Sequence, residues 1–358
     1  MSVYKSFSVK VEGASHKKEG KGCQDSVFNI EIGNVSVAVV ADGHGDNNSF
    51  RSEKGSKIAV NCTVKGIAEF VKIHEHRFNS GFFKKKDLLT HDEFNKAIRD
   101  LVKHIIAAWH QKVEEDRTIY PFTSDELNRT DEKYRKKYEA GNGLNKVYGT
   151  TLIASAITDY YWFGIHIGDG RITALYPDGT FDQPVPWDDK CYLNVTTSIC
   201  DDNAFEQTRC YFSFHNERKP PVAVFLCTDG IDDNYPVEGN EKHLFKLYRT
   251  IAITFLKDGF DSTVKQLKEL ADAFATKGKG DDTSIAGFID MYTLKKVEPI
   301  WQLQINDDEK KAGKKIENDR QKNASEAENE IKSSDTSETL DEAVNAYKMK
   351  RGINRNAV

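Results

Sequence analysis

Aspartate turns at the boundaries of apolar, β-type segments constrain this chain more than any other feature of its sequence. Each apolar segment predicts a buried strand, and an aspartate directly beside it places a carboxylate at the edge of a sheet. A single Asp-Gly turn is common in proteins, whereas four such boundaries in one chain indicate a shared site. The four are Asp42 after 35–41, Asp169 after 161–167, Asp229 after 222–228, and Asp281-Asp282 before 284–289.

Carboxylates that gather in one place repel one another and must be neutralised. Only Arg171 and Lys279 lie beside these turns in the sequence, which is too little positive charge for the whole set. A hard divalent cation is the natural neutraliser, and ligands that are all oxygen favour Mg²⁺ or Mn²⁺ over Zn²⁺. Gly43 allows close backbone approach, so its carbonyl can also reach a cation. Hydrolysis of a phosphate ester by water held between two ions is the chemistry that this arrangement serves best.

Short β-type runs and amphipathic helical segments follow one another in blocks. The order is strands, two long helices, more strands, two helices and a final strand, which favours antiparallel sheets with helices on their outer faces over a parallel sheet. The predicted strands are 7–11, 27–32, 35–41, 150–158, 161–167, 171–176, 222–228 and 284–289, and the predicted helices are 54–74, 93–114, 244–256 and 264–274.

Two charged stretches stand apart from this pattern. Residues 116–144 are polar and predict an exposed insertion before the central hairpin. From about Asn306 the apolar period is lost, so we expect 296–358 to be a charged tail, partly disordered or helical. Such a segment cannot bury enough apolar surface to offset the entropy of ordering it. One domain over 1–295 is therefore expected.

Composition argues against several classes of partner. The formal net charge is -5 and no long basic stretch is present, which disfavours nucleic acid. The six cysteines are scattered without a Cys-x-x-Cys pair, so thiols in a reducing compartment are favoured over a zinc cage or disulfides. No segment approaches the roughly 18 apolar residues that cross a bilayer, and 1–13 resembles a strand more than a signal peptide. We expect a cytoplasmic protein with no nucleic-acid or membrane partner.

Six short motifs, in order, resemble the metal-dependent protein phosphatase family, also called protein phosphatase 2C, and in particular its bacterial-type members. The resemblance covers roughly residues 1–290. It implies an α+β fold, a four-layer α-β-β-α sandwich with two central antiparallel sheets flanked by helices. It also implies hydrolysis of phosphoserine and phosphothreonine in a phosphorylated protein, such as a serine/threonine kinase or its target. The motifs are Cys23-Gln24-Asp25, Asp42-Gly43-His44-Gly45, Tyr148-Gly149-Thr150-Thr151, Gly168-Asp169-Gly170-Arg171, Thr228-Asp229-Gly230 and Asp281-Asp282-Thr283-Ser284.

The resemblance also implies which residues hold metal. Asp42 would bridge two Mn²⁺ or Mg²⁺ ions, with the carbonyl of Gly43 as a further ligand. Asp229 and Asp281 would complete the coordination sphere of one of these ions. Asp169, together with Asp229, would hold a third and weaker ion.

Two further residues receive roles from the same resemblance. Asp25 would lie in the outer shell and orient water bound to the metal. His44 would be the general acid that protonates the departing serine or threonine oxygen. Asp42 and His44 are accordingly the residues expected to be catalytic.

The chain departs from the family pattern on the side that binds phosphate. Gln24 stands where the family often has a glutamate that can contact metal. Gly20 stands where a phosphate-binding arginine is usual, and Lys17, Lys18 and Lys21 are the nearby cations that could replace it. Lysine is a point charge and lacks the two-pronged geometry of arginine, so substrate binding is less firmly predicted than metal binding.

Three functional hypotheses are consistent with the sequence. The first is an active phosphoprotein phosphatase. The second is a metal-binding pseudophosphatase that recognises a phosphoprotein without efficient turnover, and the third is a regulatory scaffold acting through 116–144 and the tail. The complete aspartate set favours the first, because a protein that only binds has no need of a pair of ions that activate water.

Overall fold

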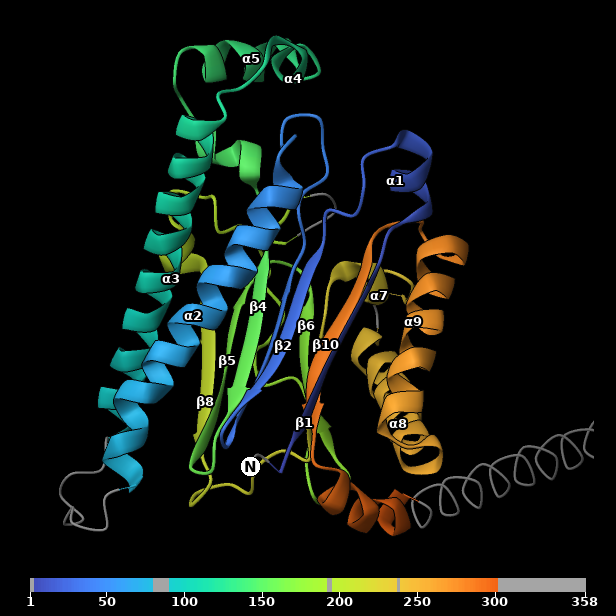
Figure 1. Ribbon diagram of the computed structural model, residues 1–358. Coiled ribbons are helices and arrows are strands. Elements are labelled where there is room, and N and C mark those ends of the chain that lie inside the picture. Colours follow the sequence, from blue (N-terminus) through green and yellow to red (C-terminus); the bar gives the residue numbers. More distant parts are fainter. Residues whose placement is uncertain (1–2, 80–89, 192–194, 237–238, 302–358) are drawn as a thin grey trace, which may run out of the picture. The chain divides into compact units, whose positions relative to one another are not determined.

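The computed structural model describes residues 3–79, 90–191, 195–236 and 239–301, and the backbone alone for 75–79. The chain divides into two compact units, 1–299 and 300–358, and every element named below lies in the first. In that unit two five-stranded sheets pack face to face. Helices α2 (Ser52–Asn79) and α3 (His91–Ile119) cover one sheet, and α8 (Asn240–Asp258) and α9 (Phe260–Lys277) cover the other (Figure 1). The predicted four-layer α+β sandwich is confirmed.

Both sheets are antiparallel throughout. One has the strand order β1-β10-β9-β6-β7 and the other has the order β2-β3-β4-β5-β8. The strands are β1 (Lys5–Val11), β2 (Ser26–Ile32), β3 (Val35–Ala41), β4 (Leu152–Ile157), β5 (Tyr161–Ile167), β6 (Arg171–Leu175), β7 (Phe181–Asp182), β8 (Arg209–Phe214), β9 (Ala223–Cys227) and β10 (Thr283–Ile289).

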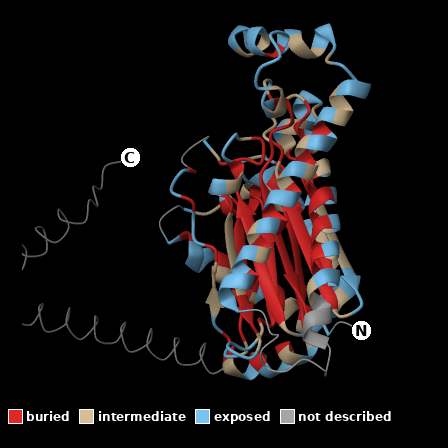
Figure 2. Ribbon diagram, turned by 90° about the vertical axis from the view of Figure 1, so that its left-hand side faces the viewer, coloured by how far each residue is buried: buried red, intermediate tan, exposed pale blue. Residues whose placement is uncertain are grey.

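Strand β3 shows why the central strands have nearly continuous apolar sequences. Val37 and Val39 belong to the core between their sheet and helices α2 and α3. Ala38 and Val40 belong to the second core, between the two sheets. Because successive side chains of a strand point to opposite faces, a strand covered on both sides carries apolar residues on both faces. The polar exception in β3, Ser36, is also buried and donates a hydrogen bond to the carbonyl of Tyr4 at 3.1 Å. Figure 2 shows the strands as a buried interior inside helices with exposed outer faces.

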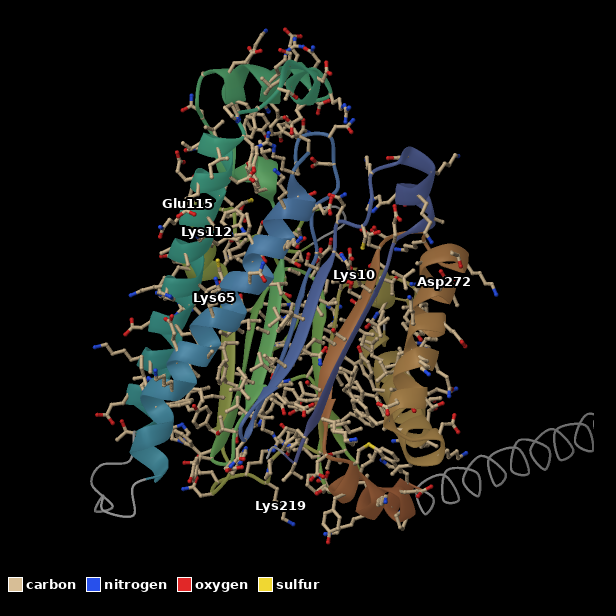
Figure 3. All side chains as sticks on the ribbon, in the orientation of Figure 1. Lys10, Lys65, Lys112, Glu115, Lys219 and Asp272 are labelled. Carbon is tan, nitrogen blue, oxygen red and sulfur yellow. The ribbon has the colours of Figure 1, made fainter. Side chains whose placement is uncertain are left out.

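Helix α3 illustrates how the outer layer is built. Thr90 caps it: its side chain accepts a hydrogen bond from the backbone N–H of Glu93, while the side chain of Glu93 accepts one from the backbone N–H of Thr90. The outward face is charged, and Lys112 and Glu115 form an ion pair there at 2.5 Å (Figure 3). The inward face repeats at helical spacing through Phe94, Ile98, Leu101, Val102, Ile105, Trp109 and Val113.

The segment between α3 and β4 is folded. It contains α4 (Ser124–Asn128), α5 (Glu132–Glu139) and the 3₁₀ helix η1 (Leu144–Tyr148), and α4 and α5 lie beyond the end of α3 at the top of Figure 1. Most of its side chains are exposed, although Tyr138 is buried. The remaining short helices are α1 (Ala14–Glu19), α6 (Ala204–Gln207) and α7 (Asp229–Asp232).

A buried arginine fixes this segment to the start of α2. Arg51 is 7% exposed, and its guanidinium donates to both carboxylate oxygens of Glu126, at 2.8 and 2.9 Å. It also donates to the hydroxyl of Tyr148 at 2.9 Å and to a carboxylate oxygen of Asp116 at 3.3 Å. The contact with Arg51 lowers the pKa of Glu126 to about 2. The guanidinium of Arg51 therefore connects the start of α2 with α3, α4 and η1.

The elements predicted from the sequence are all present, and several further elements, most of them short, were not predicted. All eight predicted strands and all four predicted helices are present, with ends that differ by a few residues. Strands β7 and β8 and helix α1 were not predicted. Residues 291–299 are helical, so helix continues across the expected boundary at 295. Of the predicted tail, residues 302–358 lie outside the described residues.

Replacing Arg51 tests whether this clamp holds the segment. Arg51→Met should lower the free energy of unfolding by about 2–4 kcal/mol, because it leaves Glu126 and Asp116 without their buried partner. Urea denaturation measures the change. Lys136→Met is the matched control, since Lys136 pairs with Glu132 on the exposed surface of α5 and its loss should cost less than about 0.5 kcal/mol. Equal losses in the two variants would contradict the clamp.

Candidate metal centre

The antiparallel topology brings the aspartate turns to one end of the sandwich. Strands β3 and β5 flank β4 and are therefore parallel to each other, so Asp42 and Asp169 leave the same end of their sheet. In the other sheet, Asp229 follows β9 and Asp281 precedes β10, its antiparallel neighbour. The end of one strand thus meets the start of the next. Sequence positions up to 239 residues apart, from 42 to 281, become neighbours.

Three of these aspartates form a compact cluster. One carboxylate oxygen from each of Asp42, Asp169 and Asp229 lies within 4.8 Å of the other two. They line an open pocket of about 360 Å³. The other lining residues are His16, Gly43, His44, Gly45, Asp46, Thr151, Thr196, Asp233 and Asp281.

Burial and mutual repulsion make this cluster electrostatically unfavourable. Burial, reinforced by the neighbouring carboxylates, raises the pKa of Asp42 and of Asp229 well above the usual range. Burial also raises the pKa of Asp169, whose Oδ1 has no hydrogen-bond partner among the described residues. Three clustered carboxylates, one of them with a free, buried oxygen, and no nitrogen or sulfur ligand among the three fit a hard cation such as Mg²⁺ or Mn²⁺.

Arg171 and Lys279, the cationic residues next to the aspartate turns in the sequence, form ion pairs with carboxylates outside the cluster. The guanidinium of Arg171 forms an ion pair with Asp232 at 2.5 Å and lies over the ring of Trp187. The ammonium of Lys279 pairs with Asp233 at 2.9 Å. Neither pairs with a carboxylate of the three-aspartate cluster. The protein therefore leaves that negative charge for a bound cation.

Asp281 and Asp25 occupy different positions from the three clustered aspartates. Asp281 lines the same pocket but stands at its rim, with its side chain 53% exposed. Asp25 is fully buried behind the pocket, and one of its oxygens accepts a hydrogen bond from the hydroxyl of Thr228 at 3.0 Å. Its other oxygen has no partner among the described residues. Burial and the charge of Asp282 raise the pKa of Asp25 to about 7.

Backbone pairing continues past the end of β3 and fixes the turn that carries Asp42. Asp42 accepts a hydrogen bond from the backbone N–H of Thr151 at 2.8 Å, and Gly43 forms a β-bridge with Thr150. A side chain at position 43 would stand 2.8 Å from the carbonyl oxygen of Gln24 and 2.9 Å from that of Ser52. Glycine is therefore required there for close packing. Gly43 lines the same pocket as the three clustered aspartates.

His44 is held in a defined orientation by Ser198, a residue that the sequence reasoning missed. The backbone N–H of His44 donates to the carbonyl of Gly149 at 3.1 Å, and its Nε2 lies 2.9 Å from the hydroxyl of Ser198. That hydroxyl can donate to the carbonyl of Thr150 at 2.8 Å, and it also accepts a hydrogen bond from the backbone N–H of Thr150 at 3.2 Å. When it donates to Thr150, Nε2 is the donor in its hydrogen bond with His44. Burial lowers the pKa of His44, which favours the neutral ring.

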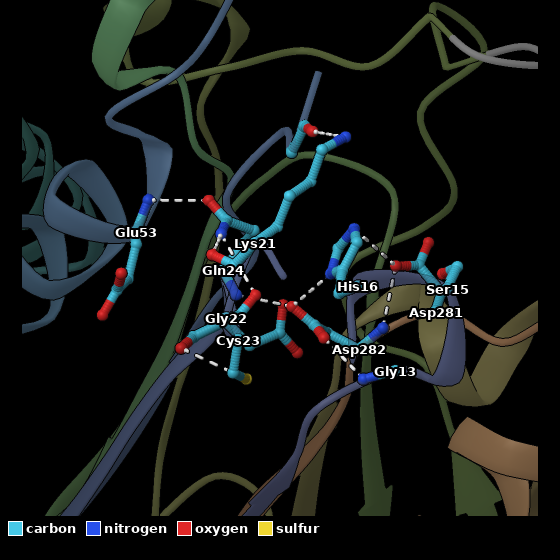
Figure 4. A network of polar contacts seen from close by, with 12 residues as sticks. Gly13, Ser15, His16, Lys21, Gly22, Cys23, Gln24, Glu53, Asp281 and Asp282 are labelled. Atoms are coloured by element: carbon cyan, nitrogen blue, oxygen red, sulfur yellow. Dashed lines mark hydrogen bonds and ion pairs between the residues drawn. The ribbon is translucent and has the colours of Figure 1, made fainter. Parts of the chain in front are cut away.

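A second histidine also reaches the pocket (Figure 4). The Nδ1 of His16 lies 3.0 Å from a carboxylate oxygen of Asp282, and its Nε2 lies 4.0 Å from Asp281. Asp282 is buried and also accepts backbone hydrogen bonds from Gly13 at 2.7 Å and Gln24 at 2.5 Å. Asp282 raises the pKa of His16, which opposes the effect of burial. Nothing in the local sequence around Ser15-His16 indicated this contact, which depends on the fold.

Gln24 and the lysines near Gly20, where the sequence departs from the family pattern, make defined contacts in the structure. The amide of Gln24 donates to the carbonyls of Lys21 and Gly22, and its oxygen accepts from the hydroxyl of Ser52 at 2.6 Å. This side chain joins the loop to the start of α2 and does not line the metal pocket. Of the three candidate lysines, Lys21 donates to the carbonyl of Gly45 at 3.0 Å, beside the metal pocket. Lys17 instead lies 3.9 Å from Asp272 on α9.

In the part of the chain that the structure describes, no helix combines the length and the apolar character needed to cross a membrane.

Comparison with known proteins finds similarity at the levels of sequence family and fold. The family model of protein phosphatase 2C matches residues 12–271. No curated protein sequence matches the chain. The similar solved structures include the serine/threonine phosphatase Stp1 from Staphylococcus aureus, at 13% identity and TM-score 0.46, covering 81% of this chain and 95% of that one.

Two further solved structures match this chain with similar sequence identity, coverage and TM-score. PppA, a key regulatory component of T6SS in Pseudomonas aeruginosa, is 15% identical with TM-score 0.46, and the match covers 80% of this chain and 97% of PppA. The catalytic domain of the serine threonine protein phosphatase PstP, in complex with two manganese ions, is 14% identical with TM-score 0.42, and the match covers 80% of this chain and 97% of that domain.

The raised carboxylate pKa values predict how stability depends on pH and metal. A carboxylate whose pKa is higher in the folded than in the unfolded state makes the metal-free protein less stable as pH rises through the interval between the two values. Added Mn²⁺ binds the ionised cluster and stabilises the fold. Mn²⁺ should therefore raise the melting temperature by several degrees more at pH 8 than at pH 5, as measured by calorimetry.

The variant Asp42→Asn tests whether the aspartate cluster is the site at which Mn²⁺ acts. It removes one negative charge from the cluster, so it should raise the melting temperature of the metal-free protein at pH 8 and reduce the effect of Mn²⁺. Equal stabilisation by Mn²⁺ at both pH values would show that the ion does not bind these carboxylates.

Proposed function

This chain belongs to the protein phosphatase 2C family, and we propose that it is an active, metal-dependent protein serine/threonine phosphatase. The observation that carries the proposal is the convergence of Asp42, Asp169 and Asp229 in an open pocket, where no Lys or Arg among the described residues forms an ion pair with them. A phosphorylated protein, such as a serine/threonine kinase or its target, is the proposed substrate.

The carboxylates around the pocket would hold two ions, with room for a third. Asp42 would bridge the first two, Gly43 would add its carbonyl, and Asp229 and Asp281 would complete one of the spheres. Asp169 would hold a third ion together with Asp229. Bound Mn²⁺ or Mg²⁺ neutralises charge on phosphoryl oxygens and lowers the pKa of water, which the carboxylates alone cannot do. Asp25, whose free oxygen is buried behind the cluster, would orient water from the outer shell.

His44 would supply the proton that the leaving oxygen needs. A serine or threonine alkoxide is a poor leaving group, so protonation as the P–O bond breaks lowers the barrier. To act as the acid, His44 must be the imidazolium, which becomes a neutral ring when Nε2 gives up its proton; burial lowers the pKa of His44 and opposes this form, so the bound phosphate would have to favour it. Nε2 lies 2.9 Å from the hydroxyl of Ser198, and a small rotation of the ring away from Ser198 would redirect its proton to substrate. Ser198 is thus proposed as a positioning residue for His44.

The pseudophosphatase and the scaffold remain the alternatives to be tested. Gly20 and Gln24 motivate the first, because they replace family residues on the phosphate and metal sides. The packed segment 116–144 motivates the second. An unpaired carboxylate cluster favours catalysis over both, because such a cluster has an electrostatic cost that a protein without a need for metal could avoid.

Hydrolysis of a phosphothreonine peptide should require Mn²⁺ or Mg²⁺ and stop in excess chelator. Asp42→Asn should lower kcat/KM by about 100-fold or more, since losing a direct ligand should cost at least as much as losing an outer-shell partner. Release of inorganic phosphate measures both effects. Asp189→Asn, an exposed aspartate outside the pocket, is the matched control and should keep its activity. Turnover that persists without metal would overturn the mechanism, and no turnover at all would favour the pseudophosphatase.

His44→Ala should slow poor leaving groups selectively. Loss of a general acid typically costs 10²–10⁴-fold, so hydrolysis of phosphothreonine should fall by at least about 100-fold. Aryl phosphates should be affected much less, because their leaving oxygen needs no proton. The exposed His104→Ala is the control, and kcat on the two substrate classes is the measurement. Equal losses on both substrates would remove His44 as the acid.

A further inference from the structure

A second pocket of about 580 Å³ adjoins the metal pocket. Gly45 and Asp46 line both pockets, so the two hollows meet at the loop that follows Asp42. The second pocket is lined by residues of α1 and of the loop that follows it and by Arg129 of the α4–α5 segment. Figure 1 shows α1 and the α4–α5 segment at the upper end of the view. Its other lining residues are Glu19, Gly20, Lys21, Gln24, Asn47, Ser49, Phe50 and Arg129.

Most of the charged groups in this pocket already have partners. Lys21 forms an ion pair with Glu19 at 2.8 Å. The carboxylate of Asp46 accepts backbone hydrogen bonds from Asn48 at 2.8 Å and from Ser49 at 2.6 Å. Arg129 differs, because its exposed side chain forms an ion pair with none of the described residues. Of the two cationic side chains that line the pocket, Arg129 is thus the one without an acidic partner among the described residues.

The α4–α5 segment is docked firmly enough to serve as a wall. Asn48 and Asp131 exchange two hydrogen bonds, each at 3.1 Å, and the hydroxyl of Tyr138 donates to the carbonyl of Asn48 at 3.0 Å. The ring of Phe50 packs edge-on against Phe122 with centroids 5.2 Å apart. These contacts join the segment to the loop that carries the metal ligands. Arg129, at the end of α4, is therefore held at the border of the second pocket.

We propose that this second pocket binds the residues that flank the phosphorylated side chain, and that Arg129 selects an anionic side chain among them. The anion can be a carboxylate or a second phosphoryl group, since a guanidinium binds both in the same two-pronged geometry. This inference rests on the proposed phosphatase function, which places the substrate phosphate at the metal centre. An extended peptide advances roughly 3.3–3.6 Å per residue, so residues within a few positions of the phosphate can reach an adjoining pocket.

A peptide series tests this selection. A single glutamate is moved through three positions on either side of phosphothreonine in a neutral peptide, and a second series carries phosphoserine in its place. The unmodified protein should hydrolyse one position with a kcat/KM about threefold to fivefold above the neutral peptide, the range of an exposed ion pair. Comparing the two series shows which anion is preferred. A peptide with lysine at that position should show no gain.

Substitution of Arg129 assigns the effect to this residue. Arg129→Gln should abolish the preference, and Arg129→Glu should reverse it in favour of the lysine peptide. Lys133→Gln, which removes the same charge from an exposed site in the same segment, should retain the preference of the unmodified protein. A preference that survives Arg129→Gln would overturn the role of Arg129.

Failure of this inference and failure of the proposed function give different results. Turnover of aryl phosphate and of the neutral phosphopeptide, with no preference for any anionic position, would overturn the pocket assignment and leave the phosphatase intact. Absence of all turnover would contradict the phosphatase. In that case, equilibrium binding of fluorescein-labelled forms of the same peptides in Mn²⁺ would still decide whether Arg129 selects an anion, since the preference would appear as a threefold to fivefold difference in Kd.

Discussion

The repulsion among Asp42, Asp169 and Asp229 is the constraint on which the rest of this structure depends. Three carboxylates within 4.8 Å of one another would separate if they stood on mobile loops. Each instead follows directly after a strand of the buried double sheet, where ladder hydrogen bonds and two apolar cores fix the backbone. The stability of the sandwich therefore opposes the repulsion and holds the three carboxylates in an arrangement that fits a bound cation.

The surrounding contacts extend this rigidity outward from the sheet ends. Asp282 joins His16 to the loop before β2, Gln24 joins that loop to the start of α2, and Arg51 joins α2 to the α4–α5 segment. The metal pocket and the adjoining pocket are thus built on one connected set of polar contacts. A substrate residue bound beside Arg129 would contact the same loop that carries Asp42. Substrate binding in the adjoining pocket and hydrolysis in the metal pocket would therefore be linked through this loop.

Much of the fold and part of the site followed from the sequence. Val35–Ala41 predicted a strand because all its positions except Ser36 are apolar, and the aspartates beside such strands predicted a metal site. Strand β8 was missed because Arg209–Phe214 shows neither a continuous apolar run nor a regular alternation, and Ser198 and His16 were missed because a hydroxyl or an imidazole in a loop has no distinctive pattern. Their partners, His44 and Asp282, lie 154 and 266 positions away in the chain.

By itself, the sequence determined which residues carry charge, which runs must be buried, and the order in which strands and helices occur, because these properties depend on local periodicity and composition. Only the tertiary structure decided which aspartates meet, with Asp281 left at the rim and Asp25 behind the pocket. It also decided that Arg171 and Lys279 neutralise other carboxylates, and that Lys21 and Arg129 border a second pocket. Distances between side chains depend on strand register and on the packing of the layers, which no single segment of the sequence contains.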